Sequence, residues 1–229
     1  MDWTLLSLIC GLISGICWLI GDILLVGFDA QEEKYKNFLE HTIINNKEMA
    51  VLMLDGSIRR LRLGALAAHF SIPFMIFSVY SLYSQAFSSL WGITAAALLG
   101  IAFSISPVAH VAFYYVGTLC KSLFDEHNEG KQKNLSGEKL VNEYLLFLNI
   151  TWVAAVGLTF LGWGIYTILI LFGKTTFPNW FFLLTPLIMS PVAGILTSKL
   201  KIGRPYLNGA GLNIGLTIFF LAALLYYVF

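Results

Sequence analysis

Charged residues are scarce in this chain. Asp, Glu, Lys and Arg make up 12% of its 229 residues, about half of their share in an ordinary soluble domain. Basic and acidic residues nearly cancel, 14 against 13 for a net charge of +1, so no overall field favours nucleic acid as a partner. Because 58% of the residues are hydrophobic, the composition excludes an ordinary soluble domain.

Several motifs that would carry chemistry are missing as well. The sequence has no P-loop, no dinucleotide fingerprint and no nucleophile motif. Its cysteines form no CxxC pair, and Cys10 and Cys17 are two helical turns apart, too far for a disulfide within one helix. No strong internal repeat supports an inverted-repeat transporter. The N-terminal segment lacks the basic region and cleavage site of a signal peptide, so we expect its apolar block to be a retained span.

What the chain has instead is long apolar blocks. A helix needs about 20 mainly apolar residues to cross a hydrocarbon core of about 30 Å, and six blocks reach that length. We therefore predict an all-α, polytopic transmembrane bundle, one domain over residues 1–229, in the plasma membrane with lipids as its partners. The oligomeric state does not follow from the sequence. The predicted spans are residues 4–27, 61–83, 90–119, 143–172, 180–198 and 209–229.

The basic residues predict the orientation of the bundle. The first, third and fifth loops between the spans hold 13 of the 14 Lys and Arg residues, which places these loops in the cytoplasm. An even number of spans then puts both termini on the non-cytoplasmic side. Within the fifth span, Pro186 and Pro191 should kink or break the helix.

The two long cytoplasmic loops differ in pattern. In the first, Asp29 and Glu32 have capping-box spacing, and apolar residues that follow at helical intervals predict an amphipathic helix over residues 29–45. Such a helix either lies on the cytoplasmic leaflet or forms a lid over a cytoplasmic-side cavity. The third loop, residues 121–139, is polar and indicates a solvated linker. The buried face of the predicted helix consists of Tyr35, Phe38, Leu39 and Ile43.

Three ionisable side chains lie well inside the apolar blocks. An ionisable group in a bilayer is costly enough to indicate function by default. Counted from the cytoplasmic ends of their spans at 1.5 Å per residue, Asp22, His69 and His110 lie roughly 8, 12 and 13 Å deep. We therefore predict that these three residues form one catalytic layer in the cytoplasmic half of the membrane.

Other polar groups can complete this layer as a substrate-binding set. Some lie at the same depth in the remaining spans, one shares a helical face with His110, and two arginines at the start of the second span could hold a lipid phosphate. Interhelical hydrogen bonding is the alternative role for any one of them. The predicted set is Arg60, Arg62, Tyr114, Asn149, Ser190 and Asn213.

A metal is the alternative use of the layer. Two histidines and a carboxylate are a known ligand set for Zn²⁺ or Fe²⁺. The three residues come from three spans without HxxxH or HExxH spacing, so the spacing does not favour a metal, and we assign no metal ligand and no cofactor. Proton transfer needs no metal, because histidine titrates near neutral pH.

Two resemblances accompany these residues. The stretch Gly21-Asp22-Ile23-Leu24-Leu25-Val26-Gly27 resembles the GDxLLxG segment that closes the first span in a poorly characterised family of bacterial polytopic membrane proteins. That family also has an arginine at the start of its second span and a histidine in its third, which Arg60 or Arg62 and His110 match. The same stretch, with residues 64–69 and Tyr80, is similar to the lysoplasmalogenase-like membrane proteins. That resemblance implies vinyl-ether hydrolysis by intramembrane acids.

Three functions remain open at this point. The first is hydrolysis of a lipid-like substrate, in which Asp22 activates water and His69 or His110 protonates the leaving group. The second is a small-solute or proton-coupled transporter that uses Asp22 as its coupling carboxylate and the proline-broken fifth span as its moving element. The third is a non-catalytic subunit of a membrane assembly. Whether the chain is an enzyme is thus undecided by the sequence.

Overall fold

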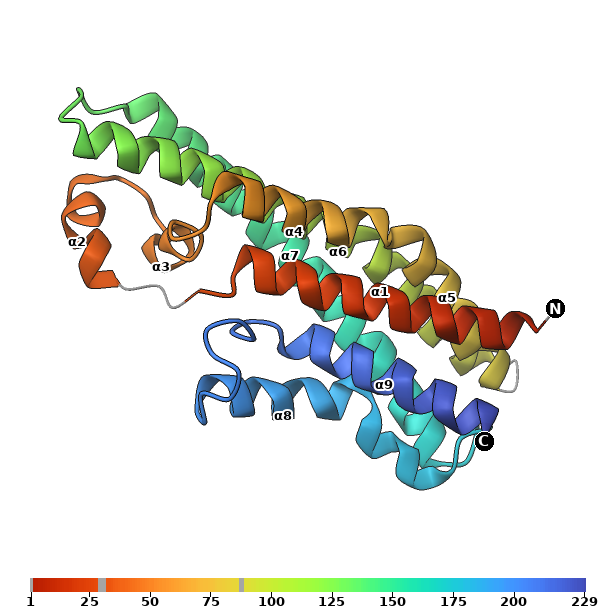
Figure 1. The fold of residues 1–229 in the computed structure, drawn as a ribbon. Coiled ribbons are helices and arrows are strands. Elements are labelled where there is room, and N and C mark those ends of the chain that lie inside the picture. Colours follow the sequence, from red (N-terminus) through yellow and green to blue (C-terminus); the bar gives the residue numbers. More distant parts are fainter. Residues whose placement is uncertain (1, 29–31, 87–88) are drawn as a thin grey trace.

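The computed structural model describes residues 2–28, 32–86 and 89–229, and within these ranges it contains helices and turns but no strand. Both termini lie at one end of the bundle, and the α6–α7 hairpin extends at the opposite end beyond the other long helices (Figure 1). The elements are α1 (Trp3–Leu25), α2 (Glu32–His41), α3 (Lys47–Val51), α4 (Ile58–Phe70), α5 (Ile72–Gln85), α6 (Leu90–Asn128), α7 (Leu135–Leu171), η1 (Asn179–Leu184), α8 (Pro186–Ser198) and α9 (Gly211–Val228).

Five helical segments of the described chain are long and apolar enough to cross a membrane: α1, α4 together with α5, α6, α7 and α9. The predicted span over residues 180–198 is instead divided into the 3₁₀ helix η1 and the α-helix α8. The break falls at Thr185, just before Pro186, whose ring and missing N–H prevent helix continuation. With 13 residues α8 is about 20 Å long, short of the bilayer core. The described chain is thus all-helical with five candidate membrane-spanning helices, and six crossings remain a prediction.

The second span is one segment with a break in it. Between α4 and α5 the hydroxyl of Ser71 donates to the carbonyl of Ala68 over 2.9 Å. Pro73, in the first turn of α5, has no N–H with which to continue the ladder of α4. The carbonyl of Ser71 accepts the backbone N–H of Met75 and also the hydroxyl of Ser14 on α1, each over 3.1 Å. The break therefore joins α1 to this span by a buried polar contact.

The prediction of a solvated linker over residues 121–139 was wrong. The helix α6 continues to Asn128 and α7 begins at Leu135, so only a short turn separates two helices of 39 and 37 residues. The polar residues alternate with apolar ones at helical spacing, and Leu123 and Val141 are buried. These buried residues belong to a second core that includes Phe38 of α2 and Val51 of α3. The hairpin is ordered because the first loop covers one of its faces.

The predicted amphipathic helix is present but shorter, and it is covered differently. It occupies α2, and the predicted cap Asp29 lies outside the described residues. Tyr35 and Phe38 are buried, with their rings packed edge-on against Phe124 of α6. Ile43 lies beyond the helix end and is 43% exposed. The apolar face of α2 thus packs against the protein and does not lie on the leaflet, because the α6–α7 hairpin offers a complementary apolar face.

Polar contacts hold the first long loop in place against the α6–α7 hairpin. Asp55 accepts hydrogen bonds from Lys34 and from the Tyr35 hydroxyl. Burial raises the pKa of the Asp55 carboxyl, but the Lys34 and Tyr35 contacts outweigh it and leave that pKa below its usual value. The bonds of this carboxylate therefore support the loop above about pH 4 and weaken as the pH falls below that. The amide of Asn142 on α7 bonds both the Asn45 N–H and the Ile43 carbonyl, over 2.9 and 3.0 Å.

The predicted orientation can be tested from the two sides of the membrane. Gln132, in the α6–α7 turn, and Lys174, between α7 and η1, are both exposed. We expect Gln132→Cys and Lys174→Cys to react with a membrane-impermeant maleimide from opposite sides, with Gln132→Cys on the cytoplasmic side. The chain without an added cysteine is the control, since Cys10 and Cys120 are buried. Labelling of both variants from one side would contradict six crossings.

Candidate functional site

The site depends on a close approach between α1 and α4. A Cβ atom added at Gly21 would lie 3.1 Å from the Gly64 carbonyl oxygen, and one at Gly64 would lie 2.9 Å from the Gly21 carbonyl oxygen. The same hypothetical Cβ of Gly21 would lie 3.7 Å from Cδ2 of His110. These two glycines therefore let the backbones of α1 and α4 touch, whereas a Cβ at Gly21 would meet the imidazole of α6 only at ordinary van der Waals distance. This is the packing reason for the first glycine of the GDxLLxG stretch.

The C-terminal end of α1 is held by Arg60 of α4. Its guanidinium donates to the carbonyls of Ile23 over 2.6 Å and Gly27 over 3.3 Å, and lies 4.0 Å from the ring centre of Phe28. Carbonyls in the last turn of a helix lack intrahelical partners and carry partial negative charge. Arg60 is thus engaged by protein groups one turn from Asp22, and this engagement does not support its predicted role in substrate binding.

The structure brings together one residue from each of three helices. Nε2 of His110 on α6 lies 3.2 Å from Oδ1 of Asp22 on α1. The other oxygen of Asp22, Oδ2, accepts a hydrogen bond from the side-chain amide of Asn213 on α9 over 2.6 Å. The amide oxygen of Asn213 is buried and has no hydrogen-bond partner. Asp22, His110 and Asn213 therefore form a connected polar group, the Asp22 cluster.

A proton is needed to make all of these contacts. Nδ1 of His110 lies 3.2 Å from the backbone carbonyl of Ser106, which can only accept, so this contact is a hydrogen bond only when Nδ1 carries hydrogen. A neutral imidazole would then present a lone pair at Nε2 to the Asp22 carboxylate. The contact is attractive only when the pair holds one more proton, on Nε2 or on the carboxyl. With that proton His110 and Asp22 are together neutral, the inexpensive state inside a bilayer.

The other predicted catalytic residue lies elsewhere. His69 is exposed on α4, and its ring contacts the neighbouring Phe70. The sequence predicted a similar depth in the membrane for His69 and Asp22. The rotation of α4 about its axis, however, directs the His69 side chain away from Asp22. No group of three His, Cys, Asp or Glu residues that could hold a metal exists in the part of the chain that the structure describes. The two-histidine ligand set therefore does not assemble there.

Only some of the predicted substrate-binding residues lie near the Asp22 cluster. Asn149 and Arg62 are exposed, away from the cluster, and Tyr114 packs its ring against Tyr115. Ser190 of α8 lines the same cavity as Asn213, and its hydroxyl lies 3.5 Å from the Leu212 carbonyl. The depths predicted from the sequence could not separate these residues, because depth does not show which face of a helix points inward.

A cavity of about 700 Å³ adjoins the Asp22 cluster, within the size range of small-molecule sites. Its walls come from α6 and α7 on one side and from α8 and α9 on the other, and Asp22 and His110 lie in its wall. Trp152 of α7 and Ile195 of α8 line it and are 48% and 52% exposed. Exposed apolar side chains of α7 and α8 therefore border the cavity. It is a largely apolar groove whose polar groups come from α1, α6, α8 and α9.

The two ends of this groove differ. Met49 of α3 and the following Leu52 are part of its lining, so the first long loop covers part of the cavity. The helix α2, for which the sequence offered a lid as one alternative, contributes no described residue to this lining. Toward the termini, α7, η1 and α9 meet in a buried aromatic core. There Trp163 lies 4.6 Å from Phe219 between ring centres, and Phe181 stacks on Phe177. This aromatic core joins α7, η1 and α9 on the side of the termini.

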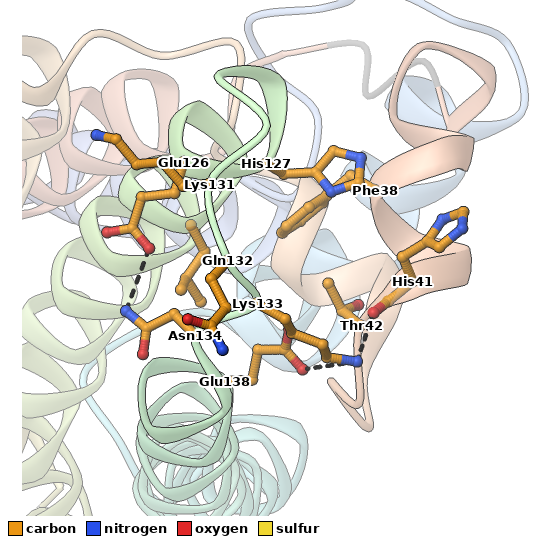
Figure 2. Close-up of a pocket in the computed structure, with 11 residues that line it drawn as sticks. Phe38, His41, Thr42, Glu126, His127, Lys131, Gln132, Lys133, Asn134 and Glu138 are labelled. Atoms are coloured by element: carbon orange, nitrogen blue, oxygen red, sulfur yellow. Dashed lines mark hydrogen bonds and ion pairs between the residues drawn. The ribbon is translucent and has the colours of Figure 1, made fainter.

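A smaller pocket of about 300 Å³ lies between α2 and the α6–α7 turn (Figure 2). Its polar groups largely satisfy one another. Lys133 donates to the His41 carbonyl over 2.6 Å and lies 3.7 Å from the Glu138 carboxylate, while Asn134 donates to Glu126 over 3.1 Å. Such mutual pairing joins the loop to the hairpin, and the larger cavity remains the candidate site.

Sequence reasoning missed the cavity's apolar lining. Trp152, Phe113 and Phe160 shape its walls, but an aromatic residue in a span has no feature that distinguishes a cavity wall from a lipid-facing surface. The carbonyl of Ser106 was missed for a similar reason, since a backbone group has no sequence signal. Trp18 of α1 is buried, with its ring 6.0 Å from that of His110.

The fold and the site define the class: a polytopic helical membrane protein with a polar cluster beside an intramembrane groove. The chain belongs to a family of unknown function, DUF6796, whose model matches residues 1–228. No curated protein and no solved structure matches the chain. The family match bears neither on the GDxLLxG stretch nor on the lysoplasmalogenase resemblance, so both remain hypotheses.

Proposed function

We propose that the chain is a proton-coupled carrier for an amphiphilic solute, with Asp22 and His110 as its proton site. One observation carries the proposal: the contacts of His110 with both Ser106 and Asp22 require a shared proton. A solute that changes the charge balance beside this pair changes its proton count, which is the coupling that such a carrier needs. The groove supplies an apolar surface for the rest of the solute.

Hydrolysis receives less support from the same geometry. An acid and a base that act on one bond must reach it from two positions, with substrate or water between them. Here Asp22 and His110 contact each other directly, and the second nitrogen of His110 is bound to Ser106. The direct contact therefore favours the carrier over the hydrolase.

The division of the fifth predicted span also supports a carrier. The helix α8 begins after the break at Thr185 and has Pro191 inside it. Gly215 of α9 permits its close approach, since a Cβ there would lie 2.5 Å from the Ser190 hydroxyl. A short, proline-interrupted helix beside the groove is an element that can move against α7.

The test measures protons directly. The purified chain in lipid nanodiscs, weakly buffered with a pH-sensitive dye, is exposed to tetraphenylphosphonium, tetraphenylborate and triphenylphosphine oxide, which are cationic, anionic and neutral. We expect binding of at least one charged probe to change the bound protons by about one per chain, and the Asp22→Asn variant to show no change. His69→Ala is the control and should behave like the unmodified chain.

Two results would overturn the proposal. One is a proton count that stays constant on binding of every probe or that changes equally in Asp22→Asn. The other is the release of an aldehyde from a vinyl-ether lysolipid by the purified chain, lost in Asp22→Asn, because this would assign the cluster to hydrolysis.

A further inference from the structure

We infer that the solute is a lipophilic cation, which takes the place of the shared proton beside Asp22. This inference rests on the proposed function and names the chemical class of its solute. It depends on the charges around the groove, on an unpaired acceptor and on the aromatic rings of the wall.

The first observation is the charge of the lining. Asp22 and His110 are the only ionisable residues among the described residues that line the groove, and none is Lys or Arg. Of the helices packed on α1, α4 contributes Arg60, which is bound to carbonyls of α1, and three exposed residues outside the groove lining: Arg59, Arg62 and His69. The described helices α5 and α9 contribute no Asp, Glu, Lys, Arg or His. At the cytoplasmic rim, Arg204 donates to the Thr197 carbonyl over 3.2 Å.

Loss of the shared proton leaves the pair with one net negative charge. A buried charge of this kind needs a partner, and nothing in the lining supplies a cation. A lipophilic cation in the groove would restore neutrality. In that exchange the proton leaves the pair for the solvent as the cation binds, and no covalent bond of the solute changes. An anion would require the opposite, a second proton on the pair.

The second observation concerns the polar and aromatic groups that line the groove near Asp22. The amide oxygen of Asn213, a residue 4% exposed, is buried without a hydrogen-bond partner beside Asp22. An unpaired acceptor next to a carboxylate attracts an N–H donor or a positive charge and repels an anion. Phe113, Trp152 and Phe160 line the groove, and their ring faces attract cations. The unpaired amide oxygen of Asn213 and the aromatic rings of the groove therefore both favour a positive charge.

The experiment uses the probes in nanodiscs and reads both binding and the direction of proton movement. We expect tetraphenylphosphonium to bind with release of about one proton per chain, and triphenylphosphine oxide to bind at least about tenfold more weakly. Asp22→Asn should lose the proton release and bind the cation at least about tenfold more weakly. Asp22→Glu, which keeps an acid, should retain the release and separates loss of charge from loss of fold.

The outcomes distinguish the two proposals. Tetraphenylborate binding with proton uptake, or equal binding of the neutral probe and the cation, would overturn the cation inference and leave the proton-coupled carrier standing. Constant proton counts with all three probes would overturn both. Cation binding with proton release that persists in Asp22→Asn would assign the exchange to another group and would also overturn the inference.

Discussion

Replacing Gly194 by leucine is expected to remove solute binding from the groove while the chain stays folded. Gly194 lies on α8 in the lining of the cavity, and a Cβ atom added there meets no atom within 4 Å. A leucine side chain can therefore extend into space that a solute would use. Leucine is also the better helix former, by about 0.8 kcal/mol, so the substitution adds no backbone cost.

The expected size of this effect is at least a tenfold loss of affinity for tetraphenylphosphonium, equivalent to about 1.4 kcal/mol. Gly157→Leu is the matched control, because Gly157 on α7 also has open space around its Cβ position but does not belong to the cavity lining. Equilibrium binding to nanodisc-embedded protein provides the measurement. Equal affinities in the two variants would place the binding site outside the groove.

The second large effect is expected at the contact of α1 with α4. In Gly64→Ala the new methyl group would lie 2.9 Å from the Gly21 carbonyl oxygen and 2.9 Å from Cβ of Leu24. Two backbones cannot yield as a flexible side chain can, so α1 and α4 must separate. Overpacking of this kind costs about 2 kcal/mol, or about a 30-fold fall in the ratio of folded to unfolded protein. Separation should also lengthen the contact of Asp22 with His110.

Gly100→Ala is the matched control for this prediction. Gly100 lies in the interior of α6, and a Cβ there meets no atom within 4 Å. The alanine should leave stability unchanged or raise it by up to about 1 kcal/mol, since alanine has the higher helix propensity. Unfolding of both variants in a detergent titration gives the two free energies. Equal stability of Gly64→Ala and Gly100→Ala would show that the close approach of α1 to α4 does not limit the stability of the fold.

Apolar length alone was enough to identify most of the architecture. Blocks of 20 or more apolar residues identified the membrane helices, because the bilayer sets their length and requires every backbone group to be bonded within the helix. The intramembrane charge rule identified Asp22 and His110 as functional candidates, since an ionisable group there is retained only with a partner. Local backbone chemistry explains why Pro186 breaks the fifth block.

Tertiary structure decided which polar residues meet. The sequence predicted one depth for Asp22, His69 and His110, but the rotation of α4, set by its glycine contact with α1, directs His69 outward. Asn213, whose amide donates to the Oδ2 atom of Asp22, lies 191 residues further along the sequence. Local patterns cannot show the helical phase that brings such residues together, because it depends on the packing of the whole bundle.

The order of the cytoplasmic layer was likewise a tertiary property. Residues 121–139 looked like a linker because their charges suit water, whereas Leu123 and Val141 lie on faces that α2 and α3 cover. An isolated pair of polar helices is only marginally stable, and it becomes ordered when its apolar stripe is buried. The sequence by itself thus predicted helices apolar enough to span a membrane and an acid within the first of them. Only the assembled bundle decided what that acid touches, because contact requires both depth and helical phase.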